Sequence, residues 1–147
     1  MTLRKLSLTL LALLLPAAAG AAEISGVPKI RDADQVQIGA ARIRLGGIDA
    51  PSTDQLCLNT RSERWACGAA ARDELVKFAG GKKWTCQARA VDRRGRTVAR
   101  CQVEGQDIQK WLVSNGWALA YVRLSKDYEA DEKLARETKA GMWQGAF

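Results

Sequence analysis

One run of 18 residues, WTCQARAVDRRGRTVARC at positions 84–101, constrains the fold of this chain more than any other feature. Two stretches of alternating residues flank Asp92-Arg93-Arg94-Gly95, a combination typical of a β-hairpin. With Arg93 and Arg94 at the tip, Cys86 and Cys101 are equally distant from it and face each other. We therefore predict an antiparallel hairpin closed by a cross-strand Cys86–Cys101 disulfide.

The other two cysteines, Cys57 and Cys67, then close a short loop. Four cysteines allow three pairings, and the expected hairpin register selects this one. No Cys-x-x-Cys pair occurs, so a zinc site is not expected. Two disulfides behind a secretory signal indicate an oxidising compartment, the periplasm or the exterior, and each would add about 2–4 kcal/mol of stability.

Residues 1–22 have the pattern of a secretory signal peptide: two basic residues, a leucine-rich run and a zone of small residues. The alternative is a membrane anchor, but the apolar run is short for a span. Cleavage after Ala21 or Ala22 fits the small residues. We predict a single domain over 23–147, with no stable membrane insertion after cleavage. Cleavage would remove Arg4 and Lys5 and no acid, which lowers the net charge from +7 to +5.

Short alternating runs predict strands at 35–39, 41–47, 83–91 and 96–103. A helix is expected over 67–79, with Ala71, Leu75 and Phe78 on its apolar face and Gly80-Gly81 after it. Strands followed by inserted and appended helices favour a small barrel that carries helices. The other elements expected are a helix at 106–115, a strand at 117–122, and a last helix capped by Ser125 that ends before Gly141.

The candidate site chemistry uses carboxylates and arginines. Histidine is absent, which excludes imidazole bases and Ser-His-Asp triads. Asp34 and Asp49 could hold a hard cation such as calcium, which takes oxygen ligands. Arg44 and Arg96 could bind a phosphate bidentately and stabilise the charge that develops when it is attacked. These are the components of a metal-dependent phosphodiesterase.

The chain resembles the staphylococcal nuclease (thermonuclease) family over about residues 27–145. The resemblance rests on the order and spacing of DADQVQIG, RIRLGGIDAPS, DRRGR, WLVSNGWALAYV and ARETKAGMW. It implies an α+β, mainly β fold: a five-stranded barrel of the oligonucleotide/oligosaccharide-binding (OB) type with three helices. It also implies calcium-dependent cleavage of DNA and RNA.

By the same resemblance, Asp34 and Asp49 occupy calcium-ligand positions, and Ala50 would offer its backbone carbonyl. Arg44 and Arg96 occupy the two phosphate-binding arginine positions. Tyr121 falls where the family has an aromatic residue that helps to bind the nucleotide. Two further positions in the substrate site, usually aromatic, are held by Arg94 and Arg123.

The resemblance breaks at the residue that follows the Asp-x-Pro sequence. The family has a glutamate there, as general base or water-orienting group, and this chain has Ser52. A neutral serine cannot take a proton from water near pH 7, and losing such a base typically costs 10²–10⁴-fold in rate. Ala33 and Gln35 also depart from the Asp-Gly-Asp-Thr pattern. Asp54 or Glu63 could substitute for the missing base.

Two functions therefore stand open: a calcium-dependent nuclease attenuated by Ser52, and a non-catalytic module that binds single-stranded DNA or RNA, or another polyanion such as an acidic envelope polysaccharide. Each site residue also has a structural interpretation, since Asp beside Gly and Pro often caps turns and an arginine on a strand can simply face solvent. We expect the five tryptophans to serve packing, and the protein to be a monomer.

Overall fold

The computed structural model describes residues 21–147, and the predicted signal segment lies outside them except for Ala21 and Ala22. The strands are β1 (Glu23–Gly26), β2 (Lys29–Asp32), β3 (Gln35–Ile38), β4 (Ala41–Leu45), β5 (Ile48–Asp49), β6 (Cys57–Leu58), β7 (Arg64–Trp65), β8 (Trp84–Val91), β9 (Thr97–Val103), β10 (Gln106–Asp107) and β11 (Leu119–Ala120). The helices are α1 (Cys67–Ala79), α2 (Ile108–Ser114), α3 (Glu129–Glu137) and the 3-10 helix η1 (Gly141–Gln144).

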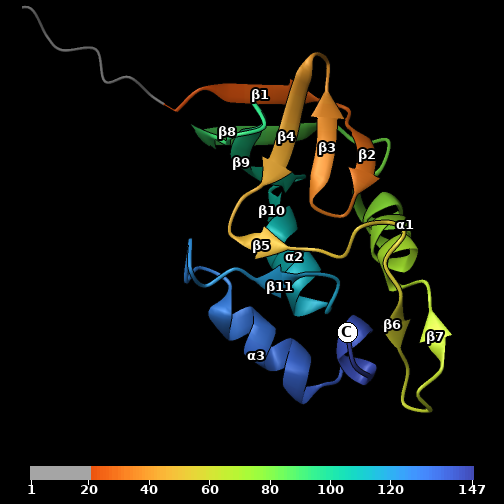
Figure 1. The fold of residues 1–147 in the computed structure, drawn as a ribbon. Coiled ribbons are helices and arrows are strands. Elements are labelled where there is room, and N and C mark those ends of the chain that lie inside the picture. Colours follow the sequence, from red (N-terminus) through yellow and green to blue (C-terminus); the bar gives the residue numbers. More distant parts are fainter. Residues whose placement is uncertain (1–20) are drawn as a thin grey trace, which may run out of the picture.

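The main sheet has the strand order β1-β8-β9-β4-β3-β2, and β10 adds to β9. Within residues 21–147, β4 and β9 are the only strands that pair in parallel. Strands β1 and β2 follow each other in the chain, separated by Val27 and Pro28, yet they lie at opposite ends of this order. They act as the two halves of one bent strand, so the sheet curls into a barrel (Figure 1). The predicted α+β, OB-type fold is confirmed, with β1–β2, β3, β4, β8 and β9 as its five strands.

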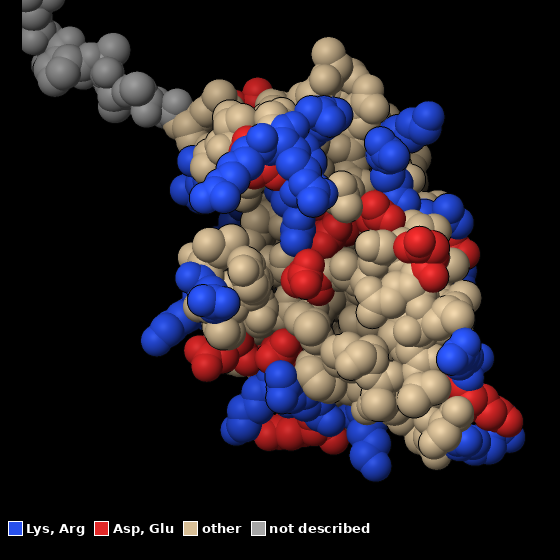
Figure 2. Space-filling model, in the orientation of Figure 1, with Lys and Arg blue, Asp and Glu red and all other residues tan. Residues whose placement is uncertain are grey.

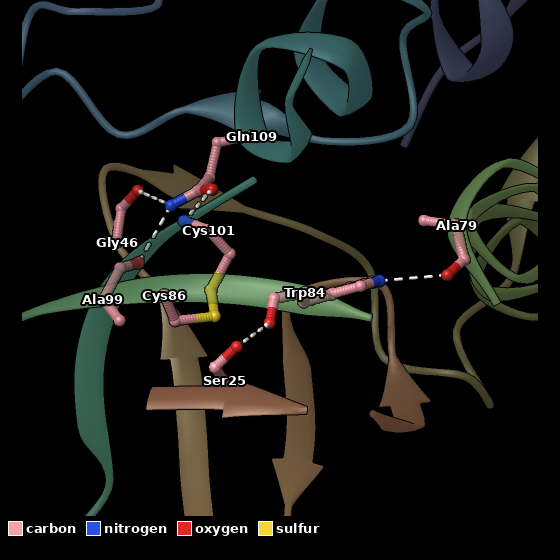
Figure 3. Close-up of a disulfide and its surroundings, with 8 residues drawn as sticks. All are labelled: Ser25, Gly46, Ala79, Trp84, Cys86, Ala99, Cys101 and Gln109. Carbon is pink, nitrogen blue, oxygen red and sulfur yellow. Dashed lines mark hydrogen bonds between the residues drawn. A yellow bond between two sulfur atoms is a disulfide. The ribbon is translucent and has the colours of Figure 1, made fainter. Parts of the chain in front are cut away.

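The barrel interior is filled by alternate residues of its strands. Val36 and Ile38 of β3, Ile43 and Leu45 of β4, and Trp84 of β8 are all buried. The indole nitrogen of Trp84 donates to the carbonyl of Ala79 at the end of α1, at 2.9 Å (Figure 3). This contact joins the barrel to the helix that follows the candidate site loop.

Both predicted disulfides are confirmed, at Cys57–Cys67 and Cys86–Cys101. Cys86 lies directly opposite Cys101, with 4.0 Å between their Cα atoms (Figure 3). The tip differs from the predicted one, because the amide of Asp92 donates to the carbonyl of Arg96 and leaves a three-residue loop. An irregularity between Ala88 and Ala90 restores the register, so the correct cysteines still meet.

Helix α1 spans the predicted residues, whereas the last helix begins later than predicted. The hydroxyl of Ser125 accepts from the amide of Asp127 in a local turn, and Tyr128 stands at the cap position of α3. The side chain of Tyr128 is buried and its hydroxyl donates to Asp107 at 3.2 Å. This anchor keeps 125–128 out of the helix.

The strand predicted at 117–122 is reduced to β11, which pairs only with the two residues of β5. Helix α2 is shorter than predicted, since Asp107 caps it by accepting from the amide of Lys110. None of the helices within residues 21–147 combines the length and apolar character needed to cross a membrane.

Candidate functional site

A cavity of about 460 Å³ opens where strands β3 and β4, the loop after β5 and the tip of the β8–β9 hairpin meet. Sheet register explains this meeting, because Gln35 of β3 lies opposite Arg44 of β4 and β9 runs beside β4. The residues that line the cavity are Asp34, Gln35, Arg44, Asp49, Ala50, Ser52, Asp92, Arg93, Arg94 and Arg96. Figure 2 shows Lys and Arg side chains gathered on the upper part of this face, with Asp and Glu atoms beneath them.

Arg44 is the organising residue of the cavity. One terminal nitrogen, Nη1, donates to the carbonyl of Leu45 at 2.8 Å and lies 3.1 Å from Asp34 Oδ2. The other, Nη2, donates to the carbonyl of Ile48 at 3.0 Å and to Asp49 Oδ1 at 3.1 Å. The guanidinium therefore holds the turn between β4 and β5 and both predicted metal-binding carboxylates at once.

Asp34 is the buried carboxylate of the site, with only 3% of its surface exposed. Its Oδ2 also accepts from the backbone amide of Ala50 at 2.8 Å. This bond ties the turn between β2 and β3 to the loop that follows β5. Burial raises the pKa of the Asp34 carboxyl above its ordinary value of 3.8, and the Arg44 guanidinium opposes this shift. Asp49, by contrast, has an exposed side chain.

Arg96 is held by a chain of side-chain hydrogen bonds. Its Nε donates to Asp92 Oδ2 at 2.7 Å and its Nη1 donates to Gln35 Oε1 at 2.8 Å. The side-chain nitrogen Nε2 of Gln35 donates in turn to Asp32 Oδ2 at 3.1 Å. Gln35 therefore positions Arg96, a role that its sequence position alone did not reveal.

Asp92 holds the backbone of the hairpin tip through its side-chain carboxylate. Its Oδ1 accepts from the amides of Arg94 and Arg96, each at 2.9 Å. These backbone bonds, led by that from Arg96, hold the pKa of the Asp92 carboxyl below its ordinary value of 3.8. The sequence alone predicts only a turn position for Asp92. The Asp-x-x-Gly pattern could have indicated this role, because Asp side chains bond the backbone two residues ahead.

Ser52 is exposed at the edge of the cavity. The loop that carries it is fixed on both sides. The amide and hydroxyl of Thr53 donate to Asp32 Oδ1 at 2.9 and 2.7 Å. On the other side, Gly68 of α1 packs so closely that an added Cβ would lie 1.7 Å from the Ser52 carbonyl oxygen.

Neither candidate for a substitute base lies in the cavity. Glu63 is on the β6–β7 hairpin, where its Oε2 accepts from Asn59 and pairs with Arg61. Asp54 is exposed and does not line the cavity. Besides Asp34 and Asp49, the only carboxylate in the lining is Asp92, which is fully engaged by the hairpin tip.

The predicted substrate-binding residues divide into two groups. Arg94 lines the cavity, with its backbone carbonyl accepting from Arg42 at 2.7 Å. Tyr121 and Arg123 are exposed on the segment after β11 and lie outside the lining. The backbone of Tyr121 is tied to the site loop, because its amide donates to the carbonyl of Gly47.

The three residues predicted to bind calcium, Asp34, Asp49 and Ala50, lie around the same cavity. No group of three or more His, Cys, Asp or Glu residues suited to a metal ion occurs within 21–147. Calcium takes six to eight oxygen ligands, so these three residues fit an ion that keeps most of its waters.

Comparisons with known proteins agree with this geometry. Residues 42–145 match the family described as Staphylococcal nuclease homologue. The chain is 33% identical, over 96% of its length and 76% of the relative's, to the succinoglycan biosynthesis protein ExoI of Rhizobium meliloti. It is 29% identical, over 75% of its length, to a probable staphylococcal-like nuclease of Oryza sativa subsp. japonica, of which it covers 27%. The chain therefore belongs to the staphylococcal nuclease homologue family.

Proposed function

We propose that this protein binds single-stranded DNA or RNA through its phosphodiester groups, and hydrolyses them slowly with calcium. One observation carries the proposal: the cavity gathers Arg44, Arg96, Asp34 and Asp49 around position 52, where a serine stands. The guanidinium of Arg96 and the positive charge of Arg44 suit a phosphate, and a proton-accepting group for the attacking water is missing.

In this proposal Asp34, Asp49 and the carbonyl of Ala50 would hold calcium, which when bound polarises a phosphoryl oxygen. Arg96 stabilises the charge that develops on the phosphate, and its own orientation is set by Asp92 and Gln35. Ser52 leaves the attacking water without a general base, so we expect hydrolysis to be 10²–10⁴-fold slower than with a carboxylate.

We further propose that the protein acts as a monomer in the periplasm or outside the cell. The predicted signal peptide at 1–22 would direct export, and two disulfides suit an oxidising compartment. The domain would then be the segment 23–147.

The test is hydrolysis of denatured DNA by the exported, oxidised protein, with calcium or with a chelator, beside Arg44→Ala. We expect slow cleavage that needs calcium and disappears in Arg44→Ala, because the loss of Arg44 leaves Asp34 buried without its counter-charge. DNA that remains intact with calcium, together with no binding of single strands at low salt, would refute the proposal.

A second candidate ligand, an acidic polysaccharide, is favoured by the similarity to a protein named for succinoglycan biosynthesis. Arginine binds carboxylate in the same bidentate way as phosphate. A competition binding experiment decides between the two ligands. An acidic polysaccharide that displaces labelled single-stranded DNA more effectively than unlabelled DNA at equal charge would favour the polysaccharide. Failure to displace the DNA would exclude it.

A further inference from the structure

We infer that the β8–β9 hairpin tip recognises the anionic backbone of a polymer without reading its bases. Three residues, Arg93, Arg94 and Arg96, are called the tip arginines here, and all three line the cavity. The inference rests on the proposed function only for the choice of ligand, a chain of phosphodiesters. It concerns what that site can distinguish.

The cavity offers no surface on which a base could stack. None of its lining residues is aromatic. Among the aromatic side chains within 21–147, Trp84 is buried in the barrel, Phe78 stacks on Trp111, and Tyr121, although 40% exposed, lies outside the lining. Stacking on an aromatic ring raises affinity by about 5- to 150-fold for each base, and this contribution is missing here.

The guanidinium nitrogens most open to a ligand belong to the tip, because the two terminal nitrogens of Arg44 face oxygen atoms of the protein. Each terminal nitrogen of Arg44 already lies within 3.1 Å of two oxygen atoms of the described structure. The side chains of Arg93 and Arg94 are exposed and make no hydrogen bond or ion pair to residues 21–147. Arg44 is therefore a positioning residue, and the tip supplies the donors that meet the anion.

The backbone of the tip is fixed before a ligand arrives. Asp92 accepts from two tip amides, Arg42 donates to the carbonyl of Arg94, and Gly95 adopts a φ of +70° that favours glycine. A preformed backbone lowers the entropy lost on binding. Guanidinium groups on this tip can donate two hydrogen bonds to the oxygens of one phosphate. Phosphate oxygens are the same along a strand whatever its bases are.

The experiment measures binding of the exported, oxidised protein to two fluorescent 12-nucleotide strands. One is oligothymidylate, and the other has the same backbone without bases. Chelator is present, so binding is measured apart from hydrolysis. The test variant is Arg93→Gln with Arg94→Gln. The matched control is Lys83→Gln with Lys110→Gln, two exposed residues away from the cavity with the same change in charge.

We expect the two strands to bind within about threefold of each other. The tip variant should bind both about 10- to 100-fold more weakly, and the slope of log affinity against log salt should fall by about 1.4. The control variant should lose much less. Oligothymidylate binding more than tenfold tighter than the abasic strand, equal losses in both variants, or no binding by the wild type would each overturn the inference. Tip-dependent, base-independent binding in chelator, by a protein that leaves denatured DNA intact when calcium is present, would uphold the inference while refuting nuclease activity.

Discussion

At the scale of single residues, the carboxylate of Asp92 controls the shape of the hairpin tip through its bonds to the amides of Arg94 and Arg96. Because these bonds favour the ionised form, the pKa of Asp92 lies below 3.8 in the folded protein. Its contribution to stability is therefore present above the unfolded pKa and is lost as the pH falls through the folded one.

The pH dependence of this contribution gives a prediction for the variant Asp92→Asn. We expect the variant to have a lower melting temperature than the wild type at pH 5–7, and the difference to shrink as the pH falls below about 4. Thermal unfolding followed by circular dichroism over pH 2–7 measures this. A difference that stays constant across the range would show that the charge of Asp92 does not matter.

Much of the residue-level site could be predicted from sequence, and the reasons for the misses are physical. Arg44, Asp49 and Ser52 line one cavity because the motif RIRLGGIDAPS places them on β4 and on the turn and loop that follow it. Asp34 joins them because the next residue, Gln35, pairs with Arg44 across the sheet. Sequence could not show that both terminal nitrogens of Arg44 are engaged, since two of their partners are carbonyls of a turn that folds back onto the side chain. Tyr121 and Arg123 fall outside the lining, on the exposed segment that follows β11.

At the scale of elements, the two disulfides have different surroundings, and we expect different consequences from their removal. Cys86–Cys101 joins the two longest strands and is fully buried in the core. Replacing both cysteines by alanine should lower the free energy of unfolding by about 2–5 kcal/mol. Denaturant unfolding measures this loss, and a change below 1 kcal/mol would contradict the prediction.

Cys57–Cys67 instead fastens the small β6–β7 hairpin, which is also held by a bridge between Leu58 and Ala146. Replacing these two cysteines by alanine should raise amide exchange mainly in residues 53–66, since few core side chains lie there. Hydrogen exchange with mass spectrometry can separate the regions. An equal loss of protection in β8 and β9 would show that this disulfide also supports the barrel.

The hairpin illustrates how far element-level prediction reaches. The correct disulfide followed from symmetry about Arg93 and Arg94, although the loop is one residue longer and an irregularity near Arg89 compensates. Side chains alternate between the inside and the outside of the barrel, and this alternation fixes which residues pair near the cysteines. The length of the hairpin loop depends instead on side-chain hydrogen bonds such as those of Asp92. The predicted start of α3 was wrong for a similar reason, because burial of Tyr128 overrides the capping signal of Ser125.

At the scale of the whole molecule, barrel closure is what assembles the site. Strands β1 and β2 join opposite ends of the sheet, and β4 pairs with β9, so segments distant in sequence meet at one cavity. The fold class could be predicted from motifs across the chain. The first strand could not, since its two halves are short and interrupted by Pro28.

The central claim is that the site keeps its phosphate-binding groups and lacks only the base at position 52. The most direct measurement is the calcium-dependent rate of single-stranded DNA hydrolysis by Ser52→Glu relative to the wild type. Because Ser52 is exposed at the cavity edge, a glutamate can be accommodated there. The account predicts a gain of about 10²–10⁴-fold, abolished by adding Arg44→Ala. An unchanged rate in a folded Ser52→Glu variant would contradict it, because the defect would then lie in the metal or phosphate site.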